Sequence, residues 1–150
     1  MTRFDPAQVM TAGCLCFRTR RLSRLITRAY DEALRPTGLQ ATQLTLLNAV
    51  AMGGADGQPM PRLTSILAMD ATTLSRNLRP LEREGLIGIR QREDDRRARV
   101  AWVTPAGEAR LEAALPFWRQ AHSRIEAALG PDLADGLREG LDAAAGALSN

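Results

Sequence analysis

The sequence predicts a mainly α-helical fold that carries one small β-hairpin. Apolar residues recur at helical spacing through most of the 150 residues. Between residues 86 and 103 the pattern changes to two short alternating runs around a charged tip, which is typical of a hairpin. Clusters of proline and glycine separate the runs. At this length we expect a single domain, residues 1–150.

The N-terminal part of the chain predicts two helices. The first runs from about residue 10 to residue 35, and the arginine, proline and glycine of residues 35–38 stop it. The second covers residues 41–52 and is followed by a glycine-rich loop over residues 53–59. Their apolar faces carry Leu15, Leu22, Leu25, Ile26, Ala29 and Ala33 in the first helix and Leu44, Leu47, Ala49 and Val50 in the second.

Two further helices follow, joined by a short turn. Pro61 suits the start of the third helix, because its missing N–H costs nothing there. Asp70 is placed to cap the fourth helix by accepting backbone N–H groups. Leu74, Leu78 and Leu81 form the inner face of that helix, and its remaining residues are polar and face outward.

The fourth helix leads into the hairpin. We expect Pro80 to kink this helix, because an interior proline removes a backbone hydrogen bond, and Gly85 to cap its end. The paired strands are residues 86–92 and 98–103, with Ile87, Ile89, Val100 and Trp102 alternating against polar neighbours. A polar helix, a hairpin and a further helix in this order predict a winged helix-turn-helix core over about residues 40–107.

Two long helices complete the chain and are separated by Gly130 and Pro131. In the last one the apolar stripe has about one residue per turn, which is too narrow for the core of a monomer but suits packing against another chain. The stripe consists of Leu133, Leu137, Leu141, Ala145 and Leu148. We therefore expect a homodimer whose dimerisation helices are residues 10–35 and 106–149.

All 20 basic residues are arginines, and they are unevenly distributed. Residues 1–104 carry 16 arginines and 10 acidic residues, whereas residues 105–150 carry four arginines and seven acidic residues. A biased genomic composition would also explain the use of arginine, but its placement suits a partner made of phosphates. No apolar run approaches the roughly 18 residues of a membrane span, and no signal peptide is evident, so we expect a cytoplasmic protein with no membrane partner.

The sequence offers little for catalysis. His122, the only histidine, stands among arginines on a predicted helix, and we interpret it as a solvated side chain. No nucleophile–base pair, paired carboxylates, phosphate-binding loop or metal-ligand cluster accompanies it. We therefore expect no enzyme, no cofactor and no metal site.

The outward residues of the fourth helix are the candidate DNA readers. Short polar side chains near the N-terminus of a helix reach base edges in the major groove, and arginine binds guanine or phosphate. A solvated helix face and a charged, soluble turn would have the same composition, but helix and wing together are a more specific signal. The candidate DNA-binding residues are Thr72, Thr73, Ser75, Arg76, Asn77 and Arg79 on the helix and Arg92, Asp95, Arg96, Arg97 and Arg99 on the hairpin.

One motif of the hairpin resembles the MarR family of transcriptional regulators. Asp95-x-Arg97 is followed after five residues by Val103-Thr104-x-x-Gly107, which is similar to the wing signature of that family, with valine where leucine is usual. Other segments fit between Cys14 and Gly107: Gly85-Leu86-Ile87, Tyr30-x-x-x-Leu34, Gly38-Leu39 and Gln43-x-x-x-Leu47.

The resemblance implies a homodimer that binds a pseudo-palindromic operator in double-stranded DNA. Each protomer would place one helix in the major groove and one wing in the adjacent minor groove. The resemblance assigns the minor-groove contact to Arg97 and the positioning of that arginine to Asp95, and it favours a repressor. A winged helix that binds protein instead of DNA, as an adaptor module, is the alternative.

The resemblance further implies a small phenolic or aromatic acid as the effector that releases DNA. Arg20 or Arg24 is a candidate partner for its carboxylate, and Trp118 is a candidate to stack on its ring. A solvated arginine and a core tryptophan are the alternatives.

Oxidation of Cys16 is a second candidate signal. Cys16, Thr27 and Tyr30 fall at the spacing of the peroxide-sensing branch of the same family, although Arg20 stands where that branch has a tyrosine. Inert thiols are the alternative. Cys14 and Cys16, placed on one helix, would lie about 200° apart, so we expect no disulfide and no shared metal between them.

Overall fold

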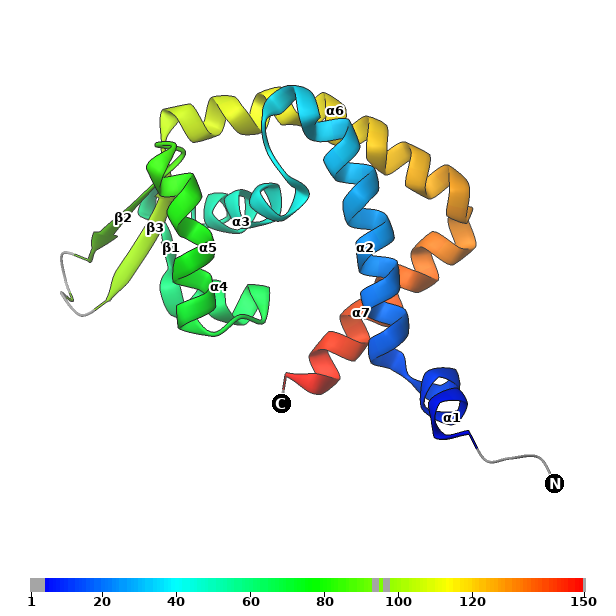
Figure 1. Ribbon diagram of the computed structural model, residues 1–150. Coiled ribbons are helices and arrows are strands. Elements are labelled where there is room, and N and C mark those ends of the chain that lie inside the picture. Colours follow the sequence, from blue (N-terminus) through cyan, green and yellow to red (C-terminus); the bar gives the residue numbers. More distant parts are fainter. Residues whose placement is uncertain (1–4, 93–94, 96–97, 150) are drawn as a thin grey trace.

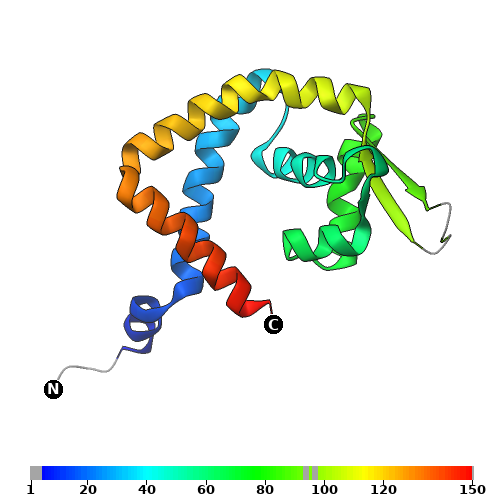
Figure 2. The same cartoon turned by 180° about the vertical axis from the view of Figure 1, so that it is seen from behind.

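The computed structural model describes residues 5–92, 95 and 98–149. Its elements are α1 (Pro6–Gly13), α2 (Leu15–Leu34), η1 (Arg35–Thr37), α3 (Ala41–Ala51), η2 (Gly54–Asp56), β1 (Gln58–Pro59), α4 (Met60–Leu67), α5 (Ala71–Arg83), β2 (Ile87–Gln91), β3 (Arg99–Val103), α6 (Pro105–Leu129) and α7 (Pro131–Leu148). The long helix α6 joins two parts (Figure 1). At its start α3, α4 and α5 pack beside a small sheet, and toward its end α2 crosses it and α7 turns back, as the opposite view confirms (Figure 2). The predicted class, mainly α with a hairpin, is confirmed.

The predicted first helix is interrupted at Cys14. The backbone of Cys14 is extended, with φ −77° and ψ 111°, so α1 ends before it and α2 begins after it. Its Sγ accepts a hydrogen bond from the backbone N–H of Phe17 at 3.3 Å and thereby caps α2. The expectation that Cys14 and Cys16 share one helix is therefore wrong, and the angular argument against a bond between them no longer holds.

Leucines of α2 to α5 form the centre of the core. Leu34, Leu47, Leu63, Leu74 and Leu78 are each 0% exposed. Burying a leucine side chain completely contributes roughly 1.5–3 kcal/mol relative to leaving it in water, so this cluster is the main source of stability for the α3–α5 unit. The inward residues predicted for α3 and α5 are buried as expected: Leu44, Leu47, Ala49, Val50, Leu74, Leu78 and Leu81.

The sheet has three strands in the order β1-β3-β2, all antiparallel. The sequence predicted only two, because β1 is two residues long and contains a proline, which leaves no alternating pattern to detect. β1 lies close to β3 at Gly57, where a Cβ would stand 2.9 Å from the carbonyl oxygen of Ala101. Gly57 also has a φ of 79°, which favours glycine for a second reason.

The strand register decides which hairpin residues face the core. Ile87 pairs with Val103 and Ile89 with Ala101, and these residues pack on the core. Since paired residues lie on the same face of a sheet, Trp102, which pairs with Gly88, lies on the opposite face. Of the four residues predicted to alternate against polar neighbours, Ile87 and Ile89 therefore lie on the core face, whereas Val100 and Trp102 lie on the other face.

α5 continues through Pro80 as one helix, although the carbonyl four residues earlier loses its usual donor. Gly85, with φ 70°, then closes the helix. The N–H of Gly85 donates to the carbonyl of Glu82 at 3.0 Å, and the N–H of Leu86 donates to the carbonyl of Leu81 at 2.9 Å. This is a Schellman ending, so the predicted cap at Gly85 is confirmed.

α6 starts in close contact with the beginning of the hairpin. Thr104 caps it by accepting the N–H of Gly107 at 3.1 Å, and the N–H of Thr104 donates to the carbonyl of Leu86 at 3.0 Å. A Cβ at Gly107 would lie 2.1 Å from that same carbonyl oxygen, so only glycine fits at this crossing. The wing and α6 are thus joined as one rigid corner.

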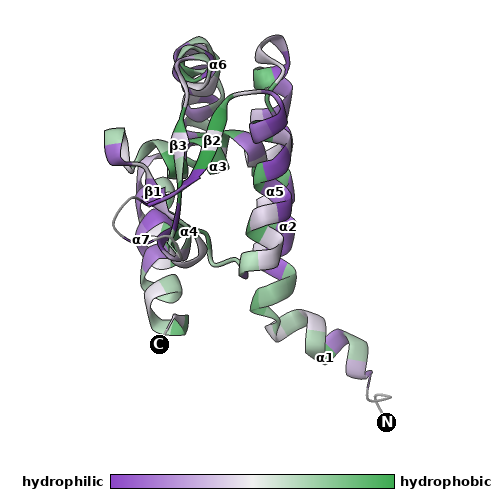
Figure 3. Cartoon of the chain, turned by 90° about the vertical axis from the view of Figure 1, so that its left-hand side faces the viewer, coloured by the Kyte–Doolittle hydropathy of each residue, from purple (hydrophilic) through white to green (hydrophobic). Residues whose placement is uncertain are grey.

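Apolar side chains remain exposed at both ends of the chain. Val9 and Met10 on α1 are 59% and 71% exposed, and Leu133, Leu141 and Leu148 on α7 are 58%, 47% and 86% exposed. Figure 3 shows hydrophobic stretches on α1 and toward the end of α7. Within the described parts of the chain, no helix is both long and apolar enough to cross a membrane.

Candidate nucleic-acid interface

Asp70 organises the N-terminus of α5. Its Oδ1 accepts the backbone N–H of Thr73 at 2.8 Å, and its Oδ2 accepts the hydroxyl of Thr73 at 2.6 Å. The hydrogen bond from the Thr73 hydroxyl, followed by that from the Thr73 backbone, lowers the pKa of Asp70. The predicted cap is confirmed, and the hydroxyl of Thr73 is engaged in it.

The outward face of α5 gathers four of the six predicted reader residues. Thr72, Ser75, Arg76 and Arg79 line one open hollow of about 410 Å³. Both arginines and Thr72 are exposed, which leaves their donor groups available to an anionic partner.

Two predicted readers lie apart from that face. Thr73 bonds to the Asp70 cap, and the amide Nδ2 of Asn77 lies 3.8 Å from the Sδ of Met69 in the turn before the helix. Both side chains are only partly exposed. The structure therefore divides the predicted set into an outward group and a group at the α4–α5 turn.

Backbone hydrogen bonds hold the loop end of the hairpin. The N–H of Arg92 donates to the carbonyl of Ala98 at 2.9 Å, and the N–H of Ala98 donates to the carbonyl of Asp95 at 2.9 Å. Arg92, Asp95 and Arg99 are exposed. The other two predicted wing residues, Arg96 and Arg97, lie outside the described residues.

The outer face of the hairpin carries an arrangement that sequence reasoning missed. The indole of Trp102 lies on Gly88, where a Cβ would stand 2.2 Å from the ring. The guanidinium carbon of Arg90 lies 5.1 Å from the centroid of the same ring, which is a cation–π distance. The sequence could not reveal this contact, because it depends on the strand register that pairs Gly88 with Trp102. A lone glycine in a strand indicates only that some other group approaches closely.

A second cluster lies where α2, α6 and α7 meet, and it overturns the interpretation of His122 as a solvated side chain. The hydroxyl of Tyr30 and Nδ1 of His122 are 3.0 Å apart. Nε2 of His122 lies 3.3 Å from Oε1 of Glu126, which also pairs with Arg138 of α7 at 2.9 Å. Burial, and then the charge of Glu126, raise the pKa of Tyr30, so its hydroxyl keeps its proton.

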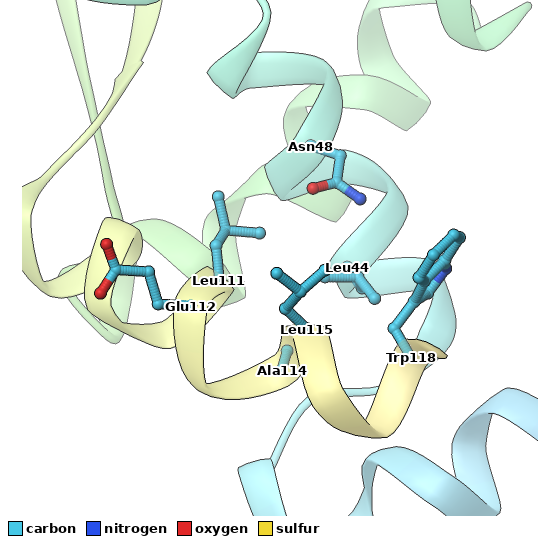
Figure 4. Close-up of a pocket in the computed structure, with 7 residues that line it drawn as sticks. All are labelled: Leu44, Asn48, Leu111, Glu112, Ala114, Leu115 and Trp118. Atoms are coloured by element: carbon cyan, nitrogen blue, oxygen red, sulfur yellow. The ribbon is translucent and has the colours of Figure 1, made fainter. Parts of the chain in front are cut away.

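Trp118 belongs to this cluster and also borders a pocket. Its ring stacks on His122 at 4.6 Å between centroids and on Tyr30 at 6.3 Å. A pocket of about 380 Å³ opens beside it between α3 and α6 (Figure 4). Its lining is mostly apolar: Leu44, Asn48, Leu111, Glu112, Ala114, Leu115 and Trp118.

The structure does not bring the predicted carboxylate partners to that pocket. Arg20 and Arg24 line a different hollow on α2, together with Thr19 and Ser23. In Figure 4 the amide of Asn48 points toward the pocket, whereas the carboxylate of Glu112 points away from the other lining side chains. No cationic side chain lines this pocket among the residues that the structure describes.

The two cysteines differ in their surroundings. Cys16 is exposed on the first turn of α2, whereas Cys14 is partly buried at the helix break. Over the described ranges, no group of three histidine, cysteine or acidic residues is arranged to hold a metal ion.

Residues 39–107 match the family model of a winged helix DNA-binding domain. The segment contains α3, α4, α5 and the hairpin, so the fold is that of a DNA-binding protein of the winged-helix class. The chain is 32% identical to the transcriptional regulator MosR of M. tuberculosis, solved in complex with DNA, with a TM-score of 0.79 and coverage of 90% of this chain and 96% of that one. It belongs to the MarR family of transcriptional regulators, which in general are not enzymes.

Two more distant structures share the fold. A mutant of MarR from E. coli, complexed with operator DNA, is 20% identical with a TM-score of 0.78, covering 90% of this chain and 96% of that one. CouR from Rhodococcus jostii, bound to p-coumaroyl-CoA, is 22% identical with a TM-score of 0.74, covering 89% and 93%. Comparison with curated proteins gives no significant match.

Proposed function

We propose that this protein is a homodimeric repressor that reads a pseudo-palindromic operator with the outward face of α5. The observation that carries the proposal is the hollow formed by Thr72, Ser75, Arg76 and Arg79. Two hydroxyls and two guanidinium groups on one helix face supply the donors and acceptors that base edges and phosphates require. MosR, which shares 32% of its residues with this chain, was solved with DNA and supports the proposal.

The experiment that tests the proposal is selection of binding sites from random double-stranded DNA. An inverted repeat is expected, since a two-fold symmetric dimer reads two half-sites about one helical turn apart. Affinity for the selected site should fall steeply between about 50 and 200 mM salt, as counterion release predicts. A flat salt response would favour the adaptor module that binds protein.

Dimerisation would cover the apolar residues exposed on α1 and α7. Leu133 and Leu141 stand in the open, and a single chain offers nothing among its described residues to bury them. Replacing Leu141 with glutamate should shift the mass measured by light scattering toward the monomer, because the charge would enter an apolar contact. A mass that is monomeric in the unchanged protein at every concentration would refute the dimer.

In the wing, we assign the minor-groove contact to Arg97 and its positioning to Asp95, on the sequence signature described above. A guanidinium is attracted by the negative potential of a narrow minor groove. The cations at the loop end of the strands, Arg92 and Arg99, support the assignment because they are exposed on the same wing.

Release of DNA is assigned to a small aromatic ligand in the pocket beside Trp118. The lining favours an uncharged ligand over the aromatic acid implied by the family resemblance, because a carboxylate there would find the amide of Asn48 and no guanidinium. Matched amide and carboxylate probes, 4-hydroxybenzamide and 4-hydroxybenzoate, test this by their effect on operator binding. Stronger release by the carboxylate would contradict the assignment.

Oxidation of Cys16 is the second candidate signal, favoured by the exposure of its thiol. A peroxide would convert the thiol to a sulfenic acid on the first turn of α2. Operator release by peroxide should then be lost in a Cys16→Ser protein. Peroxide release that persists in this variant would eliminate the candidate.

A further inference from the structure

We propose that Arg90 is a phosphate-binding residue of the wing, held in position by Trp102 and Gly88. The inference rests on the proposed function, since it extends the DNA interface from α5 to the outer face of the hairpin. Neither the wing signature nor the polar set of α5 includes these three residues.

The strand register separates Arg90 from the core. β2 and β3 turn Ile87, Ile89, Ala101 and Val103 inward, whereas Arg90 lies on the face shared by Gly88 and Trp102. Arg90 is exposed, while Trp102 is partly buried beneath it. The guanidinium therefore sits on the solvent side of the indole.

Gly88 fixes the height of the indole above the sheet. Because a Cβ at this position would stand 2.2 Å from Cζ2 and 2.3 Å from Cη2 of Trp102, only glycine lets the ring lie this close to the strand. The guanidinium carbon of Arg90 then lies over the face of the ring, 5.1 Å from its centroid. A cation–π contact of this kind restricts a long side chain without neutralising its charge.

The charge of Arg90 is not used within the described part of the molecule. No described carboxylate forms an ion pair with it, whereas Arg110 and Arg138 each pair with an acidic residue. Its N–H donors thus face solvent, and they match the oxygens of a phosphate. A cation that is held in place and left unneutralised suits an anionic partner, because less side-chain entropy is lost when it binds.

The position along the strand favours the DNA backbone over the bases. Arg90 stands two residues before Arg92, which at about 3.3 Å per residue places it roughly 6.6 Å nearer the base of the hairpin. A minor groove is about 7.5 Å deep, which is close to this distance. If the far end of the wing enters the groove, Arg90 lies level with the sugar-phosphate backbone that borders it.

The test is the salt dependence of operator affinity in an Arg90→Ala protein. Loss of one phosphate contact in each protomer of the dimer should weaken binding at least about tenfold on every sequence alike. It should lower the slope of log affinity against log salt by about 1.8, or about 0.9 for each protomer. Arg90→Lys should restore most of the slope, because it keeps the charge. Arg124→Ala removes an exposed arginine of α6 and serves as the matched control, with affinity and slope unchanged.

The positioning role is tested separately. Trp102→Phe keeps an aromatic face and should retain most of the operator affinity. Trp102→Leu should lose part of the affinity that Arg90→Ala loses. The double variant should bind no more weakly than Arg90→Ala alone. Additive losses in the double variant would overturn the positioning role. Should the leucine variant fail to fold, Gly88→Ala displaces the ring and gives the same comparison.

Two outcomes are distinguishable. An unchanged slope in Arg90→Ala, with a steep slope in the unchanged protein, would overturn this inference and leave the DNA-binding proposal intact. A shallow slope in the unchanged protein would count against both.

Discussion

Replacing Tyr30 with phenylalanine isolates one hydrogen bond of the cluster that joins α2 to α6. The variant keeps the ring that stacks on Trp118 and removes only the hydroxyl, which lies 3.0 Å from Nδ1 of His122. We expect a loss of about 1 kcal/mol in the free energy of unfolding, the usual net worth of such a bond. The larger penalty of an unpaired buried group does not apply, because the side chain of His122 is 33% exposed and water can reach it.

The assay is urea unfolding at one fixed protomer concentration, since a dimer's stability depends on concentration. A double-mutant cycle with His122→Phe separates the hydrogen bond from other effects, and its coupling energy should be about 0.5–1.5 kcal/mol. Losses from Tyr30→Phe and His122→Phe that add to within about 0.3 kcal/mol would refute the bond as a stabilising contact.

Three further predictions concern the DNA interface. Arg97→Ala should weaken operator binding by roughly 1–3 kcal/mol with little effect on thermal unfolding, and unchanged affinity at fixed salt would count against the wing assignment. Arg79→Ala should weaken binding to all sequences alike if this side chain contacts phosphate, whereas a loss confined to one base position would contradict that role. The stability difference between the unchanged protein and Asp70→Ala should be constant near neutral pH and disappear as the pH falls below about 4. The direction of this pH dependence follows from the lowered pKa of Asp70, because folding favours the ionised carboxylate, which stabilises the protein only while it is ionised. A stability difference that survives in acid would contradict this.

The elements predicted best are those whose signals are local. Leu74, Leu78 and Leu81 repeat at helical spacing, and Asp70 and Gly85 are residue types that begin and end helices, so α5 could be placed closely. The break at Cys14 left no such signal, because apolar spacing continues on both sides and cysteine is an unusual cap.

Contacts between distant segments could not be predicted in the same way. Tyr30 and His122 are separated by 92 positions, and nothing in the pattern around either residue indicates the other. The same limit applies to Gly88 and Trp102, which meet only through the register of two strands. Four of the six residues predicted as readers on α5 lie together on its outward face. Thr73 was assigned to DNA, although its hydroxyl completes the cap.

The rigid corner at Gly107 makes α6 a lever. The helix is 25 residues long, which at about 1.5 Å per residue is roughly 37 Å. Gly107 and Glu126 lie 19 residues apart, or roughly 28 Å along the helix. A rotation of about 5° where Glu126 meets Arg138 would therefore displace the corner and the wing attached to it by about 2.5 Å, against the 3.4 Å rise of one base pair. A small change of helix angle at the cluster around Trp118 would therefore be felt at the half-site as a displacement of nearly one base pair.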